Sequence, residues 1–141
     1  MILGIDLHGV IDSDPEVFKA FMKAVSIHNF VYVISGPPAE QISEELKSFG
    51  INQTVPHYTR ICSVVDHLTS KKVPMWQDER GRWWSSEEDW WCSKAEICDQ
   101  YKVDIMIDDK ELFEPYFRSI KTHFLLYKDK NLIKTGEENE D

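Results

Sequence analysis

Cysteine is scarce in this sequence, which has three in 141 residues, at positions 62, 92 and 98. An odd and sparse set argues against a disulfide scaffold. The spacing of Cys92 and Cys98 also differs from that of a zinc knuckle. We therefore predict that the three thiols behave as small buried hydrophobic groups.

Long apolar runs are missing as well, and none approaches the roughly 18 residues that span a bilayer. The opening segment, residues 1–6, has no basic side chain and carries a carboxylate at Asp6, so it does not resemble a signal peptide. We expect no membrane partner and a cytoplasmic location.

Basic residues are outnumbered, with 16 Lys and Arg against 25 Asp and Glu and a net charge of −9. A surface that tracks nucleic-acid phosphates is therefore disfavoured, although a nucleic-acid end stays open as a substrate. The carboxylate excess fits a protein that holds a divalent cation, and it equally fits an ordinary acidic protein. Nothing in the residues indicates an oligomeric state.

Strand-like and helix-like patterns alternate along the chain. This alternation predicts right-handed crossovers and an α/β three-layer sandwich with a central, mainly parallel, Rossmann-like sheet. We expect strands at 2–5, 30–34, 105–107 and 124–127, a short strand near Val55, a hairpin at 75–84, and helices at 15–25, 38–49, 60–70, 86–101 and 111–119.

Length and composition predict one domain over residues 1–135. Within it, residues 51–86 are a candidate small cap or insertion that carries an aromatic hairpin. Residues 136–141 are acidic and are expected to form a flexible tail.

Three predicted strands end in polar residues: Asp6 after the first, Ser35 and Gly36 after the second, and Asp108 and Asp109 after the strand at 105–107. The carboxyl ends of parallel strands meet at one edge of an open sheet, where ligands bind. Clustered carboxylates repel one another unless a cation or a proton neutralises them. These residues therefore predict a divalent cation, with Mg²⁺ as the leading candidate because it accepts carboxylate, water and phosphate oxygens together.

The order of these segments resembles the four motifs of the haloacid-dehalogenase-like (HAD-like) hydrolase superfamily. The matching residues are Asp6-Leu7-His8-Gly9-Val10, Ile34-Ser35-Gly36, Lys94 and Ile107-Asp108-Asp109. The resemblance spans residues 2–117 and implies a HAD-like fold in a small-cap or capless form.

The resemblance implies a nucleophile and a metal site. Asp6 would attack phosphorus, become an aspartyl-phosphate and also bind Mg²⁺. The main-chain carbonyl of His8 would be a second ligand, and Asp108 and Asp109 would complete the metal shell.

The resemblance also implies how the phosphate is bound. The Ser35 hydroxyl and the Gly36 amide would bind the transferring phosphoryl group. Lys94 would offset the charge of the nucleophile and the phosphate, and the alternative is an ordinary solvated lysine on a helix.

His8 departs from the pattern of most phosphatases in this superfamily, which carry a second aspartate at this position as general acid and base. Three roles stay open for it. His8 transfers the proton itself, which suits a histidine near neutral pH; it binds a substrate group; or it marks a slow or inactive member.

Five tryptophans lie between positions 76 and 91. Trp90-Trp91 would seat a helix on the sheet, whereas Trp83-Trp84 would point to opposite faces of a strand, which exposes one of them. Core packing is the favoured interpretation. The alternative is that an exposed indole near Arg80 and Arg82 stacks on a base, a sugar or a partner protein.

Two functions follow. The first is a Mg²⁺-dependent phosphohydrolase that cleaves a small-molecule phosphomonoester, such as a nucleotide or sugar phosphate, through Asp6. The second is a catalytically impaired HAD-like module that binds metal or phosphate and acts through a protein partner.

Overall fold

The computed structural model describes residues 1–135, and the predicted acidic tail at 136–141 lies outside the described residues. Within the described part, six strands form a central sheet in the order β3-β2-β1-β6-β7-β8. Every neighbouring pair is parallel except β7 and β8. The bounds are β1 Ile2–Ile5, β2 Phe30–Ser35, β3 Arg60–Ser63, β6 Ile105–Asp108, β7 His123–Lys128 and β8 Asn131–Lys134.

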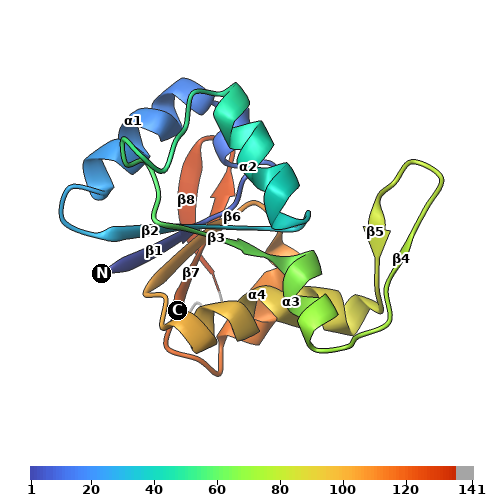
Figure 1. Cartoon of the computed structure of the whole chain (residues 1–141). Coiled ribbons are helices and arrows are strands. Elements are labelled where there is room, and N and C mark those ends of the chain that lie inside the picture. The colour runs from blue at the N-terminus through green and yellow to red at the C-terminus, as the bar shows by residue number, and fades with distance from the viewer. Residues whose placement is uncertain (136–141) are drawn as a thin grey trace.

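Helices cover both faces of this sheet (Figure 1). On one face lie α1 (Pro15–Val25) and α2 (Ala39–Ser48), and on the other lie α3 (Val64–Ser70), α4 (Glu87–Tyr101) and the 3₁₀ helix η2 (Glu111–Phe117). A short 3₁₀ turn, η1 (Ile11–Ser13), precedes α1. The predicted three-layer α/β arrangement with a mainly parallel sheet is therefore confirmed.

The strands are buried on both faces because successive side chains point to opposite sides of the sheet. On β2, Val33 packs with α1 and α2, while the next residue, Ile34, packs with α3, α4 and η2. On β6, Ile107 packs on the face of α1 and α2, and Met106 packs on the face of α3, α4 and η2. This double burial explains why these strands read as continuous apolar runs.

Residues 51–70 differ from the prediction. Val55 lies in a turn and not in a strand, and the following Pro56 has no N–H to donate to a sheet. The expected helix at 60–70 is wrong in its first half, because Arg60–Ser63 pairs in parallel with β2. Ser63 both ends that strand and caps α3, since its hydroxyl accepts from the Asp66 amide at 3.0 Å.

The C-terminal part also differs. The expected helix at 111–119 is the shorter 3₁₀ helix η2 with Pro115 inside it, and Pro115 cannot donate a helical hydrogen bond. The strand predicted at 124–127 is not the last, because β8 turns back and pairs with it. Asp129 and Lys130 form the turn with φ of 52° and 64°, the left-handed geometry that tight hairpins use.

The aromatic hairpin forms as predicted. β4 (Trp76–Gln77) and β5 (Trp83–Trp84) pair as a separate two-stranded sheet that stands apart from the main one in Figure 1. Trp84 is 46% exposed and Trp83 is half-buried, which confirms that one member of this pair is exposed. Trp76 is 55% exposed, so core packing was the wrong interpretation for it. Since β3 and α3 belong to the main layers, only the hairpin part of residues 51–86 lies outside them.

The three thiols are free cysteines; Cys62 and Cys98 are buried and Cys92 is half-buried. Among residues 1–135, no helix combines the length and the apolarity needed to cross a bilayer.

Candidate active site

The site lies where the chain changes direction across the sheet. β1 pairs with β2 on one side and with β6 on the other, and Ile5 is in register with both Val33 and Ile107. Such a switch point leaves a crevice outside the carboxyl ends of the strands. Asp6 follows β1 directly and donates its amide to the Ile107 carbonyl at 3.0 Å, which brings its side chain beside Asp108.

The Asp6 carboxylate is buried and held by two donors. The Ser35 hydroxyl, at the end of β2, donates to Asp6 Oδ1 at 2.7 Å. The Lys94 ammonium, from α4, lies 3.2 Å from the same oxygen. Burial raises the pKa of Asp6, and these two donors oppose that rise. Both of these contacts use Oδ1.

Lys94 links the first and last parts of the site. Its Nζ also donates to Asp108 Oδ2, and the residue is 2% exposed. Burial lowers the pKa of Lys94, but the Asp108 and Asp6 charges outweigh it, so the pKa rises overall and the ammonium stays charged. The Phe113 ring lies 4.5 Å below the ammonium. This burial excludes the alternative of a solvated helix lysine.

Asp109 completes an acidic cluster, because oxygens of Asp6, Asp108 and Asp109 all lie within 4.8 Å of one another. Burial and the neighbouring Asp108 charge raise the pKa of Asp109. Its Oδ1 is buried and has no hydrogen-bond partner in the described residues. A buried carboxylate oxygen without a donor is costly, so this atom marks a place where a positive ligand would fit.

The charges of the cluster do not balance. Lys94 offers one positive charge against three carboxylates that can be negative. A divalent cation would offset the remaining two charges and supply the missing partner of Asp109. The donor set, which consists of oxygens alone, suits Mg²⁺ better than a softer metal. The residues present therefore fit the predicted ion.

His8 lies on the loop after β1, but its side chain turns toward α2. Its Nε2 lies 2.6 Å from Glu45 Oε2, and the His8 side chain is 44% exposed. No described contact joins the imidazole to the acidic cluster. The carboxylate therefore holds one ring nitrogen, and Nδ1 is the nitrogen left to meet a substrate.

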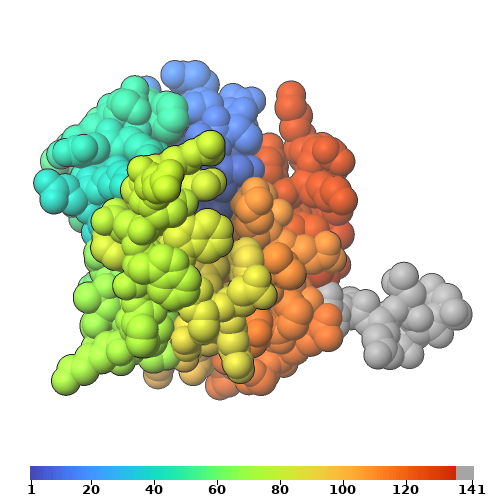
Figure 2. Space-filling view, turned by 90° about the vertical axis from the view of Figure 1, so that its right-hand side faces the viewer, coloured from blue at the N-terminus to red at the C-terminus, as the bar shows by residue number. Residues whose placement is uncertain are grey.

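A cavity of about 440 Å³ opens beside this histidine. Its core side is formed by residues after β1 and β2 and on α2 and α3, and its outer side by the hairpin. The lining residues are His8, Gly36, Pro37, Gln41, Val65, Arg80, Gly81, Arg82, Trp83 and Trp90. Figure 2 looks onto this face, where the yellow-green hairpin lies across the molecule beside the teal α2.

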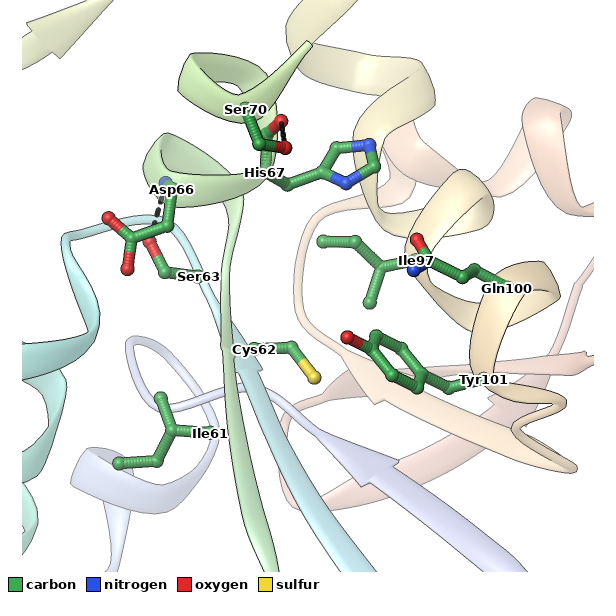
Figure 3. Close-up of a pocket in the computed structure, with 9 residues that line it drawn as sticks. All are labelled: Ile61, Cys62, Ser63, Asp66, His67, Ser70, Ile97, Gln100 and Tyr101. Atoms are coloured by element: carbon green, nitrogen blue, oxygen red, sulfur yellow. Dashed lines mark hydrogen bonds between the residues drawn. The ribbon is translucent and has the colours of Figure 1, made fainter.

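A second hollow of about 240 Å³ lies between β3, α3 and α4, and it contains no member of the acidic cluster. Figure 3 shows the Cys62 thiol pointing into it, toward Tyr101. Burial raises the pKa of Cys62 to about 11. The thiol is therefore protonated near neutral pH and is a poor nucleophile. The other titratable ring that lines the hollow, His67, makes a hydrogen bond through Nε2 to Glu96 Oε1 at 3.0 Å. We therefore take the acidic cluster at the strand ends, and not this hollow, as the candidate site.

The structure brings together most of the residues that the sequence singled out. Asp6, Ser35, Lys94, Asp108 and Asp109 lie in one cluster. Sequence reasoning missed Glu45, which has no local pattern to distinguish it from other acids on α2. It also missed the main-chain amide of Lys110, which donates to Asp108 Oδ1 at 2.9 Å.

The fold and the cluster define an α/β protein with an acidic site at a strand-order switch point. Comparison of the chain with protein-family models, curated proteins and solved structures finds no match.

Proposed function

We propose that this protein is a Mg²⁺-dependent phosphohydrolase of the HAD-like kind, which cleaves a phosphomonoester through an aspartyl-phosphate on Asp6. The observation that supports it most is the environment of the Asp6 carboxylate. One oxygen is held by Ser35 and Lys94, while two further carboxylates lie beside it in a metal-sized cluster. In this proposal Asp6 is the nucleophile, and Ser35 and Lys94 are the groups that would bind the phosphate beside it.

The reaction follows in two steps. Asp6 Oδ2 attacks phosphorus, a bond to the carboxylate forms, and the ester P–O bond breaks with its electron pair on the leaving oxygen. Water then attacks the phosphorus of the aspartyl-phosphate, which releases inorganic phosphate and restores the carboxylate. Ser35 and the Gly36 amide orient the phosphoryl oxygens, and Lys94 offsets their charge throughout.

Bound Mg²⁺ would be held by Asp6, Asp108, Asp109 and the main-chain carbonyl of His8, and it would polarise the phosphoryl oxygens and screen them from the nucleophile. Lys94 already spans Asp6 and Asp108, so the positions of these two carboxylates are set before substrate arrives.

His8 is the group that we assign to proton transfer. Its Glu45 contact favours a proton on Nε2, which leaves Nδ1 to accept or donate at the leaving oxygen. In the first step protonated Nδ1 gives its proton to the leaving group. In the second step neutral Nδ1 takes a proton from the attacking water.

Hydrolysis of p-nitrophenyl phosphate with Mg²⁺ tests the proposal. Asp6→Asn should lower kcat by about 1,000-fold or more, as loss of a nucleophile does. Asp99→Asn, an exposed carboxylate on α4, is the matched control and should leave kcat unchanged. Mass spectrometry of the acid-quenched enzyme should find one added phosphoryl group on the peptide that carries Asp6. Activity that survives Asp6→Asn would contradict the proposal.

A second function is favoured by one observation. Trp76 and Trp84 on the hairpin are about half exposed, as they would be on a surface that receives a protein partner. In that case the protein is an impaired member that binds Mg²⁺ or phosphate without turnover. Mg²⁺ binding by calorimetry, together with no hydrolysis of any phosphate ester, would favour this function over the first.

A further inference from the structure

An aromatic wall leads outward from the proposed phosphate-binding loop. A Cβ placed on Gly36 would lie 3.1 Å from Cζ2 of Trp90, so this indole packs directly against the loop. Trp83 and Trp90 both line the 440 Å³ cavity beside His8. Both also line a neighbouring apolar hollow of about 310 Å³. None of the acidic-cluster residues lines the 440 Å³ cavity, but Gly36, which directly follows Ser35, does. The indole faces therefore lie next to the proposed phosphate-binding loop.

The Asp78 side chain reinforces the hairpin that carries Trp83. The Asp78 carboxylate accepts from the Arg80 and Arg82 amides, both at 2.9 Å, from Arg82 Nε at 3.0 Å and from Trp84 Nε1 at 2.9 Å. These donors lower the pKa of Asp78 to about 2, with the Trp84 hydrogen bond as the largest cause. A wall held this way loses little conformational freedom when a ligand binds.

The hairpin also presents a free cation. Arg82 is engaged by Asp78 and lies over the Trp84 ring. Arg80 lines the cavity, and among residues 1–135 its guanidinium has no ion-pair or side-chain hydrogen-bond partner. A guanidinium stacks on planar rings and donates to ring nitrogens and carbonyl oxygens. In a chain with a net charge of −9, this is a specific placement and not a general basic surface.

The volume of the cavity further limits the kinds of ligand that it can hold. A cavity of about 440 Å³ lies in the range of small-molecule sites and greatly exceeds the space that a phosphate group needs. The acidic surface disfavours a long phosphodiester chain that would follow it. A sugar can also pack its C–H groups on an indole, but a base offers a planar ring to two indole faces together with ring acceptors for Arg80.

We infer that the hairpin forms a nucleobase subsite, so that the substrate of the proposed phosphohydrolase is a free nucleoside monophosphate. Its base stacks on Trp83 and Trp90, and Arg80 donates to acceptors on the base edge. The inference rests on the proposed function for the fate of the phosphate, but the subsite itself needs only binding.

Comparison of AMP with ribose 5-phosphate tests this subsite, because the two differ only in the base. Base stacking on an aromatic side chain should make kcat/KM about 10-fold to 100-fold higher for AMP. Trp83→Ala should bring the two substrates close to equality, and Trp83→Phe should restore most of the difference. Arg80→Gln should reduce it partly. Trp76→Ala is the matched control, since Trp76 lies on the same hairpin but does not line the cavity.

The outcomes separate the two claims. Equal kcat/KM for AMP and ribose 5-phosphate in the wild type would overturn the subsite while the proposed function stands. A 5′-phosphorylated oligonucleotide favoured over AMP by tenfold or more would overturn the free mononucleotide.

If no phosphate ester is hydrolysed, the proposed function fails, and calorimetry on the Asp6→Asn variant with Mg²⁺ still decides the subsite. AMP should then bind at least tenfold more tightly than ribose 5-phosphate, and Trp83→Ala should remove that difference. Equal affinities would overturn the inference.

Discussion

Gly9 and Asp109 lie so close together that a side chain at position 9 would have to displace the Asp109 carboxylate. A Cβ on Gly9 would lie 2.0 Å from Asp109 Oδ2, and the glycine has a φ of +87°. The two residues belong to loops that follow β1 and β6, so the backbone of one loop forms the wall behind the carboxylate of the other. The glycine thereby sets where Asp109 can point.

Gly9→Ala should therefore displace the Asp109 carboxylate and weaken Mg²⁺ binding by about 10-fold to 100-fold, the usual effect of misplacing groups around a metal. Gly50→Ala is the matched control. Gly50 also has a positive φ of +74°, but its Cβ would meet only the flexible end of Lys19. Both variants should lose about 1–2 kcal/mol of stability from backbone strain. Calorimetry with Mg²⁺ should separate them, and equal Mg²⁺ affinities would contradict the role of Gly9.

Removal of the buried Lys94 ammonium should destabilise the protein strongly. Lys94→Met leaves Asp6 and Asp108 without their counter-charge and should lower the free energy of unfolding by about 3–5 kcal/mol. Lys71→Met removes an exposed lysine paired with Glu96 and should cost less than about 1 kcal/mol. Urea denaturation measures both. Addition of Asp108→Leu to Lys94→Met should recover part of the loss, and a strictly additive double variant would contradict the coupling.

Glu45 should matter for turnover only through His8. His8→Ala should lower kcat by about 100-fold or more if the imidazole transfers the proton. Glu45→Gln should lower kcat by a smaller factor with little change in KM or in Mg²⁺ affinity, because it releases Nε2 but leaves the ring in place. Glu44→Gln, its exposed neighbour on α2, should behave as wild type. If His8→Ala keeps full turnover, proton transfer by His8 is ruled out.

Stability should fall in mild acid because of His57. The residue is buried, and burial lowers its pKa from 6.5. A hydrogen bond with the Asn52 backbone raises the pKa, whereas the charges of Lys19 and Lys23 lower it further, and the net shift is downward. The unfolded chain then binds the proton more readily than the folded one. Stability is therefore complete above the unfolded pKa and declines as the pH drops through it.

His57→Asn keeps an acceptor near Nδ1, which takes the Asn52 amide at 2.9 Å, but it cannot be protonated. Urea titrations between about pH 7 and pH 5.5 should show a decline for the wild type and a smaller one for this variant. His123→Asn, at an exposed position, should follow the wild type. Parallel curves for the wild type and His57→Asn would assign the pH dependence to other groups.

The fold was predictable where burial was continuous. The strands at 2–5, 30–34 and 105–107 are buried on both faces and so appear as apolar runs. The β3 strand does not stand out as a separate apolar run, because Arg60–Ser63 continues directly into the apolar start of α3. β8 left no trace either, because all four of its residues are exposed and only pairing with β7 defines it.

The sequence predicted those residues of the candidate site that lie at the carboxyl ends of strands. Asp6, Ser35 and Asp108 meet because parallel neighbours end at one edge. Glu45 could not be found in that way, because its partner His8 lies on a loop whose packing against α2 no local pattern encodes. Arg80 was named beside the exposed indoles, but its place in the cavity next to His8 depends on how the hairpin packs.

The central position of β1 sets the order in which the site can be assembled during synthesis. Asp6 precedes its counter-ion, Lys94, and the neighbouring carboxylate, Asp108, in the chain. A nascent chain that still ends before α4 carries Asp6 with neither, so the candidate site should form only after α4 and β6 have left the ribosome. Assembly of the site and pairing of β6 with β1 are thus tied to the same event.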